Sequence, residues 1–183
     1  MHIDSQVAAY VAEHRVWLLD RAAVATMFVG TNRAALAVIA LVGVAIVIWL
    51  RNWQMAAAVG LALISSAAVA LVLKELIGRP RPAPSLALVY AAGSSMPSAN
   101  AAVTAAVATA IFLAVDWPRS MVRRFAAAVL LVSVVWIGFC VVYLGVHWLT
   151  DVVAGWLLGG GIGVAAAWLA GRWRRSSPAP AKQ

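Results

Sequence analysis

The sequence predicts an all-α protein, a polytopic bundle of transmembrane helices preceded by an amphipathic helix at the membrane interface. Of its 183 residues, 64% are hydrophobic and 11% are charged, whereas soluble domains are about half apolar and about a quarter charged. The apolar residues gather in five runs, each close to the ~20 residues that cross a bilayer. A water-soluble fold would have too little polar surface to cover this core, and the length allows one compact bundle.

The five predicted spans occupy the central part of the chain. They are Ala34–Leu50, Met55–Leu73, Ala99–Val115, Phe125–Val146 and Leu149–Gly171. The chain therefore divides into an N-terminal segment (1–33), a membrane bundle (34–171) and a basic cytoplasmic tail (172–183). The tail ends in SSPAPAKQ, which predicts disorder because it has almost no large apolar side chain to bury.

The segment before the first span mixes charged and apolar residues. Acidic and basic side chains alternate with valine, leucine, tyrosine and tryptophan over Ile3–Phe28, which predicts one helix lying in the membrane interface. A sixth span within this segment is the alternative. The mixed charge does not fit a cleavable signal peptide, in which a basic region precedes an apolar one.

The distribution of basic residues predicts the orientation in the membrane. Arg51, the loop Asp116–Arg124 and the tail fall on one side of the bundle, and positively charged loops face the cytoplasm. The segment Lys74–Ser98 and the turn at His147 then face outward. We interpret the net charge of +8 as this topological signal, and expect the bilayer rather than a nucleic acid as a partner.

Two further features are expected to be structural. Cys140 is the only cysteine, so it cannot form an intrachain disulfide and is expected to pack as a small apolar residue. Gly155, Gly159 and Gly163 stand four apart in the last span, which predicts close helix packing through small residues. A glycine loop that binds phosphate would require a preceding strand, and the sequence predicts none.

Two polar clusters interrupt the apolar chain on the outward side. Lys74, Arg79 and Arg81 follow the second span, and they form either an anchor for lipid headgroups or a cationic cradle. Ser98 opens the third span, at the position where a serine caps the free N–H groups of a helix. Those N–H groups and the helix dipole favour an anion, although a plain cap is the alternative.

The third cluster, His147 and Asp151, opens the last span. The two residues stand four apart, so on a helix they share a face and can form a hydrogen bond. Asp151 is the only acid within any predicted span, and an ionisable residue there indicates function. A carboxylate fixes which imidazole nitrogen carries the proton and leaves the other free to attack or bind. A structural pair is the alternative, and metal binding is not expected because no further His or Cys stands near.

Taken together, the three clusters predict a site for the phosphate of a lipid. They combine cations, the N-terminus of a helix and a histidine with an orienting carboxylate. Phosphoryl transfer needs positioning and charge stabilisation more than elaborate covalent chemistry. At the depth of a span end, the molecule that carries the phosphate is expected to be a lipid.

These residues resemble the three ordered motifs of the PAP2 (phosphatidic acid phosphatase type 2) superfamily, which read K-x6-R-P, P-S-G-H and S-R-x5-H-x3-D. Lys74, Arg81 and Pro82 match the first motif, Pro97 and Ser98 match half of the second, and His147 and Asp151 match the end of the third. The resemblance extends over roughly Met55 to Gly171. It implies a bacterial protein of the cytoplasmic membrane that acts on a phosphorylated lipid without a metal or cofactor.

The resemblance also implies a role for each matching residue. His147 would attack phosphorus and form a phosphohistidine, with Asp151 as its orienting group. The other residues at these positions would hold the phosphate oxygens: Lys74, Arg79, Arg81, Ser98, Ala99 and Asn100. Of these, Arg79 is an additional candidate that the motif does not require.

The chain departs from the family pattern in two places. Ala99 and Asn100 stand in place of Gly-His, whose histidine is the expected general acid, and Cys140 and Val141 stand in place of Ser-Arg. General acid catalysis contributes about 10²–10⁴-fold, and a preorganised charge-stabilising donor contributes on the order of 10²–10³-fold. The chain is therefore expected to hydrolyse ordinary phosphate monoesters poorly.

Several hypotheses follow from these departures. A polyprenyl diphosphate, such as the bacterial wall-lipid carrier, would leave as a lipid phosphate and need little help from an acid. Asn100 would then donate to the leaving oxygen, and Arg79 would replace the absent arginine. The alternatives are a protein that binds or transports a phosphorylated lipid without cleaving it, an enzyme disabled by substitution at Asn100 or Val141, and a structural subunit.

Overall fold

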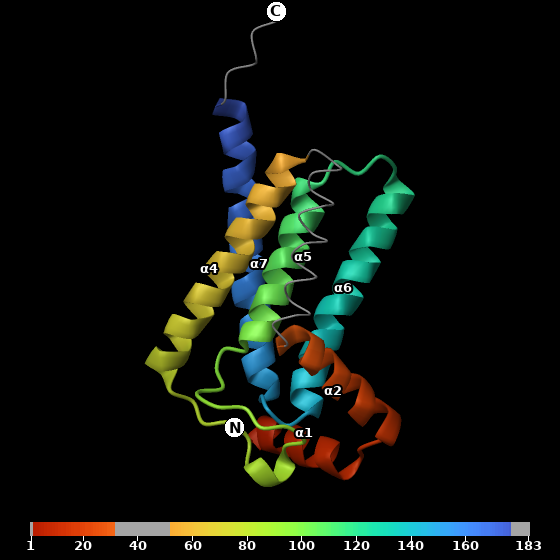
Figure 1. The fold of residues 1–183 in the computed structure, drawn as a ribbon, viewed down its shortest axis with the longest axis vertical. Helices are drawn as coiled ribbons and strands as arrows, with labels where there is room; N and C mark the ends of the chain where they lie inside the picture. Colours follow the sequence, from red (N-terminus) through yellow and green to blue (C-terminus); the bar gives the residue numbers. More distant parts are fainter. Residues whose placement is uncertain (1, 32–51, 177–183) are drawn as a thin grey trace, which may run out of the picture.

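The computed structural model describes residues 2–31 and 52–176, and within these ranges the regular structure is helical (Figure 1). The helices are α1 (His2–Glu13), α2 (Trp17–Thr31), α4 (Trp53–Ile77), α5 (Ala99–Ala114), α6 (Ser120–Tyr143) and α7 (Leu149–Ser176), and the short 3-10 turn η1 (Pro84–Leu86) lies in the loop between α4 and α5. The all-α prediction is confirmed for this part of the chain.

The long helices coincide with four of the five predicted spans. In the described ranges, α4, α6 and α7 are long and apolar enough to cross a membrane, and α5 is an apolar helix of 16 residues. The predicted span Ala34–Leu50 lies outside the described residues, so the count of five stays a prediction. α7 continues to Ser176, beyond the predicted end of the span at Gly171.

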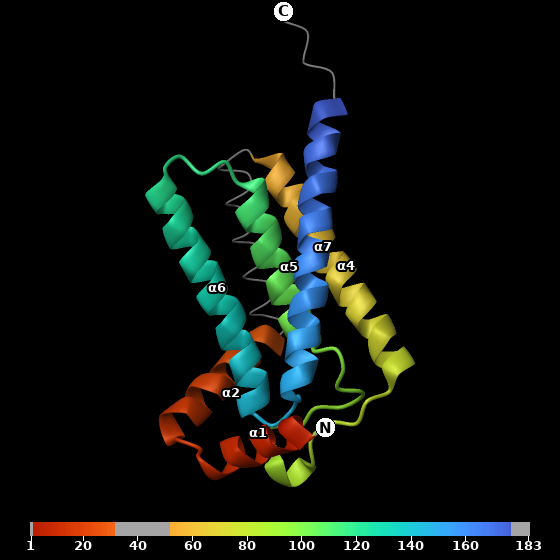
Figure 2. The same cartoon turned by 180° about the vertical axis from the view of Figure 1, so that it is seen from behind.

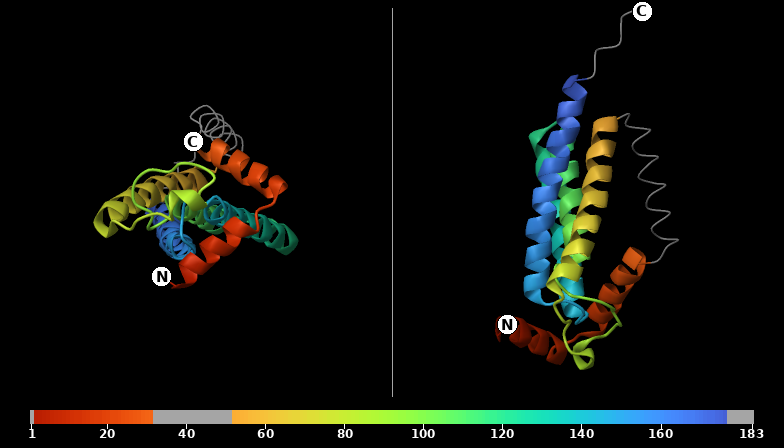
Figure 3. Two further views of the ribbon diagram at one scale, coloured as in Figure 1. Left: turned by 90° about the horizontal axis from the view of Figure 1, so that it is seen from below. Right: turned by 90° about the vertical axis from the view of Figure 1, so that its left-hand side faces the viewer.

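The prediction of one helix over Ile3–Phe28 is wrong. The N-terminal segment forms two helices, α1 and α2, which are separated around Arg15. The break is fixed by tertiary contacts, because the Val16 N–H donates to the Tyr143 hydroxyl at 2.9 Å and the Arg15 guanidinium donates to the Leu86 carbonyl. α1 lies across the lower end of the bundle in Figure 1 and in the right-hand view of Figure 3.

Helices α5 and α7 pack closely through small residues, as the glycine spacing in α7 predicts. Gly159 lies directly against the carbonyl of Ala102, and a Cβ at Gly155 would come within 2.6 Å of the carbonyl of Ser98. Close approach through small residues is a common way to pack helices in a membrane. Figure 2 shows α7 lying along α5, whereas α6 diverges from α7 toward the upper end of the bundle.

Several helix ends meet at the lower end of the bundle in Figure 1. α4 ends there at Gly78, which adopts a left-handed φ of 62°, and α5 begins there after its N-cap Ser98. α6 ends and α7 begins at the same place, with only the turn around Gly145 between them. The polar clusters of the sequence therefore come together at one end of the molecule.

We predict that Gly159→Ala destabilises the protein, because the added methyl group must separate α5 from α7. Overpacking of this kind costs about 1–3 kcal/mol. Gly160→Ala is the matched control, since a Cβ there meets nothing within 4 Å and alanine favours a helix over glycine. Thermal unfolding in one detergent compares the two variants, and equal midpoints would contradict the role given to Gly159.

Candidate active site

His147 lies in the tight turn that joins α6 to α7. Gly145 adopts a φ of 71° in this turn, and a Cβ there would collide with the carbonyl of Leu86, so the position requires glycine. The N–H groups of Val146 and His147 both donate to the carbonyl of Val141 at 3.2 Å. These bonds fix the backbone of the turn, and the side chain of His147 is only 5% exposed.

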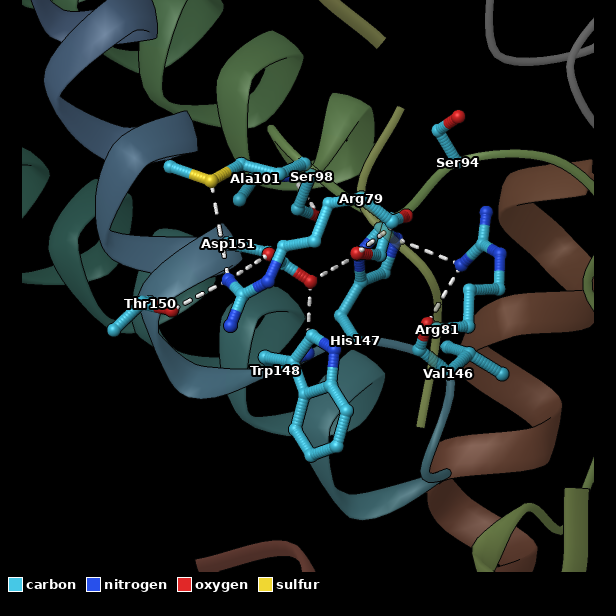
Figure 4. A network of polar contacts seen from close by, with 12 residues as sticks. Arg79, Arg81, Ser94, Ser98, Ala101, Val146, His147, Trp148, Thr150 and Asp151 are labelled. Atoms are coloured by element: carbon cyan, nitrogen blue, oxygen red, sulfur yellow. Dashed lines mark hydrogen bonds and ion pairs between the residues drawn. The ribbon is translucent and has the colours of Figure 1, made fainter. Parts of the chain in front are cut away.

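Asp151 contacts His147, as the spacing of the two residues predicts. Its Oδ2 lies 3.4 Å from Nδ1 of His147 and accepts the backbone N–H of Trp148 at 2.9 Å. Because a carboxylate only accepts, Nδ1 of the neutral imidazole carries the proton and Nε2 is unprotonated. Nε2 lies 3.4 Å from Nη1 of Arg81 and can accept its N–H, so the unprotonated nitrogen faces a cation (Figure 4).

Lys74 and Arg81 carry positive charge and form no salt bridge with a carboxylate among the described residues. Arg81 donates to the carbonyls of Val146 (2.6 Å), Ala92 (3.0 Å) and Gly93 (3.0 Å), and Lys74 donates to those of Ser94 (2.7 Å) and Ser95 (3.3 Å). Backbone carbonyls hold the two cations in place but leave their net charge available to an anion.

The N-terminus of α5 approaches the same site. Ser98 is fully buried as its N-cap, and its N–H donates to the backbone carbonyl of Asp151 at 3.0 Å. The N–H groups of Ala99 and Asn100 belong to the first turn of the helix, whose donors have no partner within the helix. The side chain of Asn100 points to α2 instead, where Nδ2 lies 3.8 Å from Sδ of Met27.

Arg79 lies on the Asp151 side of His147, whereas Arg81 lies on the other side (Figure 4). Its Nη1 is 2.6 Å from Oδ1 of Asp151, and its Nη2 is 2.7 Å from Oδ2 of Asp4 in α1. The sequence offered Arg79 as a replacement for the absent arginine, but here two carboxylates already hold its guanidinium.

Asp4 is the site residue that the sequence reasoning missed. It is 3% exposed and accepts both the backbone N–H of Thr150 at 3.0 Å and its hydroxyl at 2.7 Å. The only signal in the sequence was an acid near the start of an N-terminal helix, and such an acid is usually a solvated charge. Its position in the site follows from the docking of α1 on α7.

The position of the second departure, Val141, is apolar and 2% exposed. It belongs to a core cluster that also contains Cys140, Leu144 and Val152. Cys140 is buried and unpaired, as expected. No cation is supplied from this part of α6.

The environment of His147 favours its neutral form. Burial lowers the pKa of His147, and the nearby cations of Arg81 and Lys74 lower it further, against the hydrogen bond to Asp151. For Asp4 the balance is different, because burial raises its pKa but hydrogen bonds from Thr150 and Arg79 outweigh that effect and hold the pKa below its usual value. Near neutral pH the imidazole of His147 is therefore neutral and the carboxylate of Asp4 is ionised.

A buried His–Asp pair therefore lies beside two cations at one end of an apolar helix bundle, the architecture of a membrane protein. The sequence matches the PAP2 superfamily over residues 55–175, which is well over half of the chain. The protein therefore belongs to the PAP2 superfamily, as its motifs indicated. No curated protein sequence matches it.

Two solved structures resemble the fold closely. One is the transmembrane PAP2-type phosphatidylglycerolphosphate phosphatase from Bacillus subtilis, with a TM-score of 0.78, 26% identity, and coverage of 95% of this chain and 87% of that one. The other is LpxE from Aquifex aeolicus, with a TM-score of 0.71, 22% identity, and coverage of 89% of this chain and 93% of that one. The second likeness concerns the fold alone.

We predict that His147 titrates below about 6.5, the usual pKa of histidine, because burial and two cations oppose its protonation. Nitrogen-15 NMR of histidine-labelled protein, with His2 and His14 replaced by glutamine, gives the midpoint. Arg81→Met should raise it by removing one cation. Arg21→Met on the exposed face of α2 is the matched control and should leave it unchanged. A wild-type midpoint at or above 6.5 would contradict the assignment.

Proposed function

We propose that this protein is a membrane phosphatase in which His147 attacks the phosphorus of a lipid phosphate or diphosphate. The observation that carries the proposal is the position of Nε2 of His147. This nitrogen lies 3.4 Å from the guanidinium of Arg81, while the other imidazole nitrogen faces Asp151. A phosphate held by Arg81 would therefore lie beside an unprotonated, oriented nucleophile.

The residues around His147 would have different roles in phosphoryl transfer. Lys74, Arg81 and the first-turn N–H groups of α5, at Ala99 and Asn100 after the N-cap Ser98, would hold the phosphate oxygens. The lone pair of Nε2 would form the bond to phosphorus as the bond to the leaving oxygen breaks. Asp151 would stabilise the positive charge that develops on the imidazole. Water would then cleave the phosphohistidine and release inorganic phosphate.

The two departures favour a diphosphate as the substrate. Asn100 cannot act as a general acid, and an alkoxide leaving group would need one. A lipid diphosphate releases a lipid phosphate, which is a much weaker base and leaves without a proton. We therefore propose a polyprenyl diphosphate as the substrate class.

The placement of the basic residues supports a site on the outer side of the cytoplasmic membrane. Arg119, Arg123 and Arg124 lie at the start of α6 and Arg172 lies near the end of α7, both opposite to His147. Positive charge of this kind favours the cytoplasmic side. The site would then face outward, where a bacterial lipid carrier presents its diphosphate.

We predict that the purified protein releases phosphate from a prenyl diphosphate, and that His147→Ala abolishes the release. Asp151→Asn should lower kcat by at least about 10²-fold, because the imidazole loses its orienting carboxylate. To test for phosphohistidine, the protein is incubated with substrate labelled in its phosphate, and the label bound to the protein is then tested for release by acid.

Glu13→Gln, an exposed acid of α1, is the control and should keep full activity. If the wild-type protein releases no more phosphate than His147→Ala at any pH, the proposed function is wrong. Saturable binding of the same lipid without turnover would then favour the alternative, a lipid-binding or lipid-transporting protein.

We predict that Asn100→His combined with Val141→Arg raises the hydrolysis of a phosphate monoester, because the pair restores an acid and a phosphate-binding cation. Asn100→Gln with Val141→Leu is the control. Since Val141 is buried, Asn100→His is also measured alone, with its unfolding midpoint. If neither reversion changes the rate on the monoester, our account of the two departures is wrong.

A further inference from the structure

The proposed mechanism leaves unexplained the buried network of Asp4, Arg79 and Asp151. One guanidinium bridges two carboxylates, with Nη1 2.6 Å from Asp151 and Nη2 2.7 Å from Asp4. The carboxylates come from opposite ends of the sequence, Asp4 from α1 and Asp151 from α7, and are 3% and 0% exposed. Burying charge is costly unless it is paired and hydrogen-bonded, so this arrangement is a specific one.

Asp4 does more than balance the charge of Arg79, because it also fixes the position of the guanidinium. The guanidinium is held by Asp151, by the hydroxyl of Thr150 at 2.7 Å and by Asp4, and it lies 5.7 Å from the ring centroid of Trp148. A cavity of about 350 Å³ lies on the Asp4 side of Arg79 and is lined also by Pro80 and Trp148. Without Asp4, the cavity would leave space for the Arg79 side chain to turn into it. The gain in side-chain conformational entropy would favour that movement.

Arg79 in turn fixes the carboxylate of Asp151. Its contact to Oδ1 leaves Oδ2 for the N–H of Trp148 and for Nδ1 of His147. If Arg79 moved away, Oδ1 would be a buried acceptor without a partner. An unpaired buried acceptor is unfavourable, so the carboxylate would rotate toward another donor and lose its alignment with the imidazole.

We propose that Asp4 is a positioning residue of the active site. It holds Arg79 on Oδ1 of Asp151, which keeps Oδ2 directed at Nδ1 of His147 and Nε2 directed at the phosphate. Helix α1 is then part of the catalytic centre. This inference rests on the proposed function, because it assigns Asp4 to the same reaction.

Asp4→Asn tests the proposal, since it keeps the size of the side chain and an acceptor for Thr150 but removes the charge that holds Arg79. With a prenyl diphosphate as substrate, we expect kcat to fall about 10–100-fold, as for a misplaced reactive group. KM should stay nearly constant, because Asp4 does not touch the phosphate. Glu13→Gln, on the same helix, is the matched control and should leave both constants unchanged.

The double-mutant cycle with Arg79→Met separates positioning from a general loss of structure. If Asp4 acts through Arg79, Asp4→Asn should lower kcat no further when Arg79 is already methionine. An equal fall in both backgrounds would overturn the proposal, because it would mean that Asp4 acts only through Thr150. Equal kcat in Asp4→Asn and the wild-type protein would overturn it as well.

The tautomer of His147 gives a readout that needs no turnover. Nitrogen-15 NMR of the protein with His2 and His14 replaced by glutamine should show the Nδ1–H form in the wild-type background and a mixture with Nε2–H in Asp4→Asn. An unchanged tautomer would overturn the proposal even if the protein is an active phosphatase. A changed tautomer in a protein without phosphatase activity would refute the proposed function and leave the positioning by Asp4 supported.

Discussion

The close approach of α5 and α7 brings the N-terminus of one helix beside the His147–Asp151 pair at the start of the other. A side chain at Gly155 would collide with the carbonyl of Ser98, and the N–H of Ser98 donates to the backbone carbonyl of Asp151 at 3.0 Å. The first turn of α5 is therefore fixed against the first turn of α7. The backbone N–H groups of this first turn of α5, which have no partner within the helix, consequently lie near His147. The helix end therefore presents these donors without a glycine-rich loop. The contacts that stabilise the bundle and the contacts that build the site are here the same contacts.

The three cations of the site have different surroundings, and this difference separates their roles. Arg79 lies between two carboxylates, so its charge is compensated before any substrate arrives. Lys74 and Arg81 donate to backbone carbonyls, which orient them but carry no net charge. A cation without a carboxylate partner attracts a phosphate more strongly than a paired one, and burial strengthens the attraction by lowering the effective dielectric constant. In the sequence the three basic residues lie within eight positions of one another, whereas in the structure two carboxylates hold Arg79 and backbone carbonyls hold Lys74 and Arg81.

Local sequence patterns predicted the parts of the molecule that local forces determine. The apolar runs predicted α4, α5, α6 and α7, and the four-residue spacing predicted the contact of His147 with Asp151. The glycines predicted close packing of α7 but not that its partner is α5. The break between α1 and α2 could not be predicted, because contacts of Arg15 and Val16 with Tyr143 and Leu86 fix it, across 71 residues or more. Asp4 was missed for the same reason, since its partner Thr150 lies 146 residues away. No periodicity within α1 distinguishes such an acid from a solvated one.

The structure also gives a physical context for the two departures from the family motifs. Asn100 directs its amide toward Met27 of α2, and Val141 packs within the apolar core. Both side chains therefore contact protein in places where the family motif has a general acid and a cation. Under the proposed function, the retained charges still bind and stabilise a phosphate, while proton donation to the leaving group is lost. Such a site discriminates by the basicity of the leaving group, since a lipid phosphate departs without a proton and an alkoxide does not. Specificity for a diphosphate would then follow from what the site lacks as much as from what it contains.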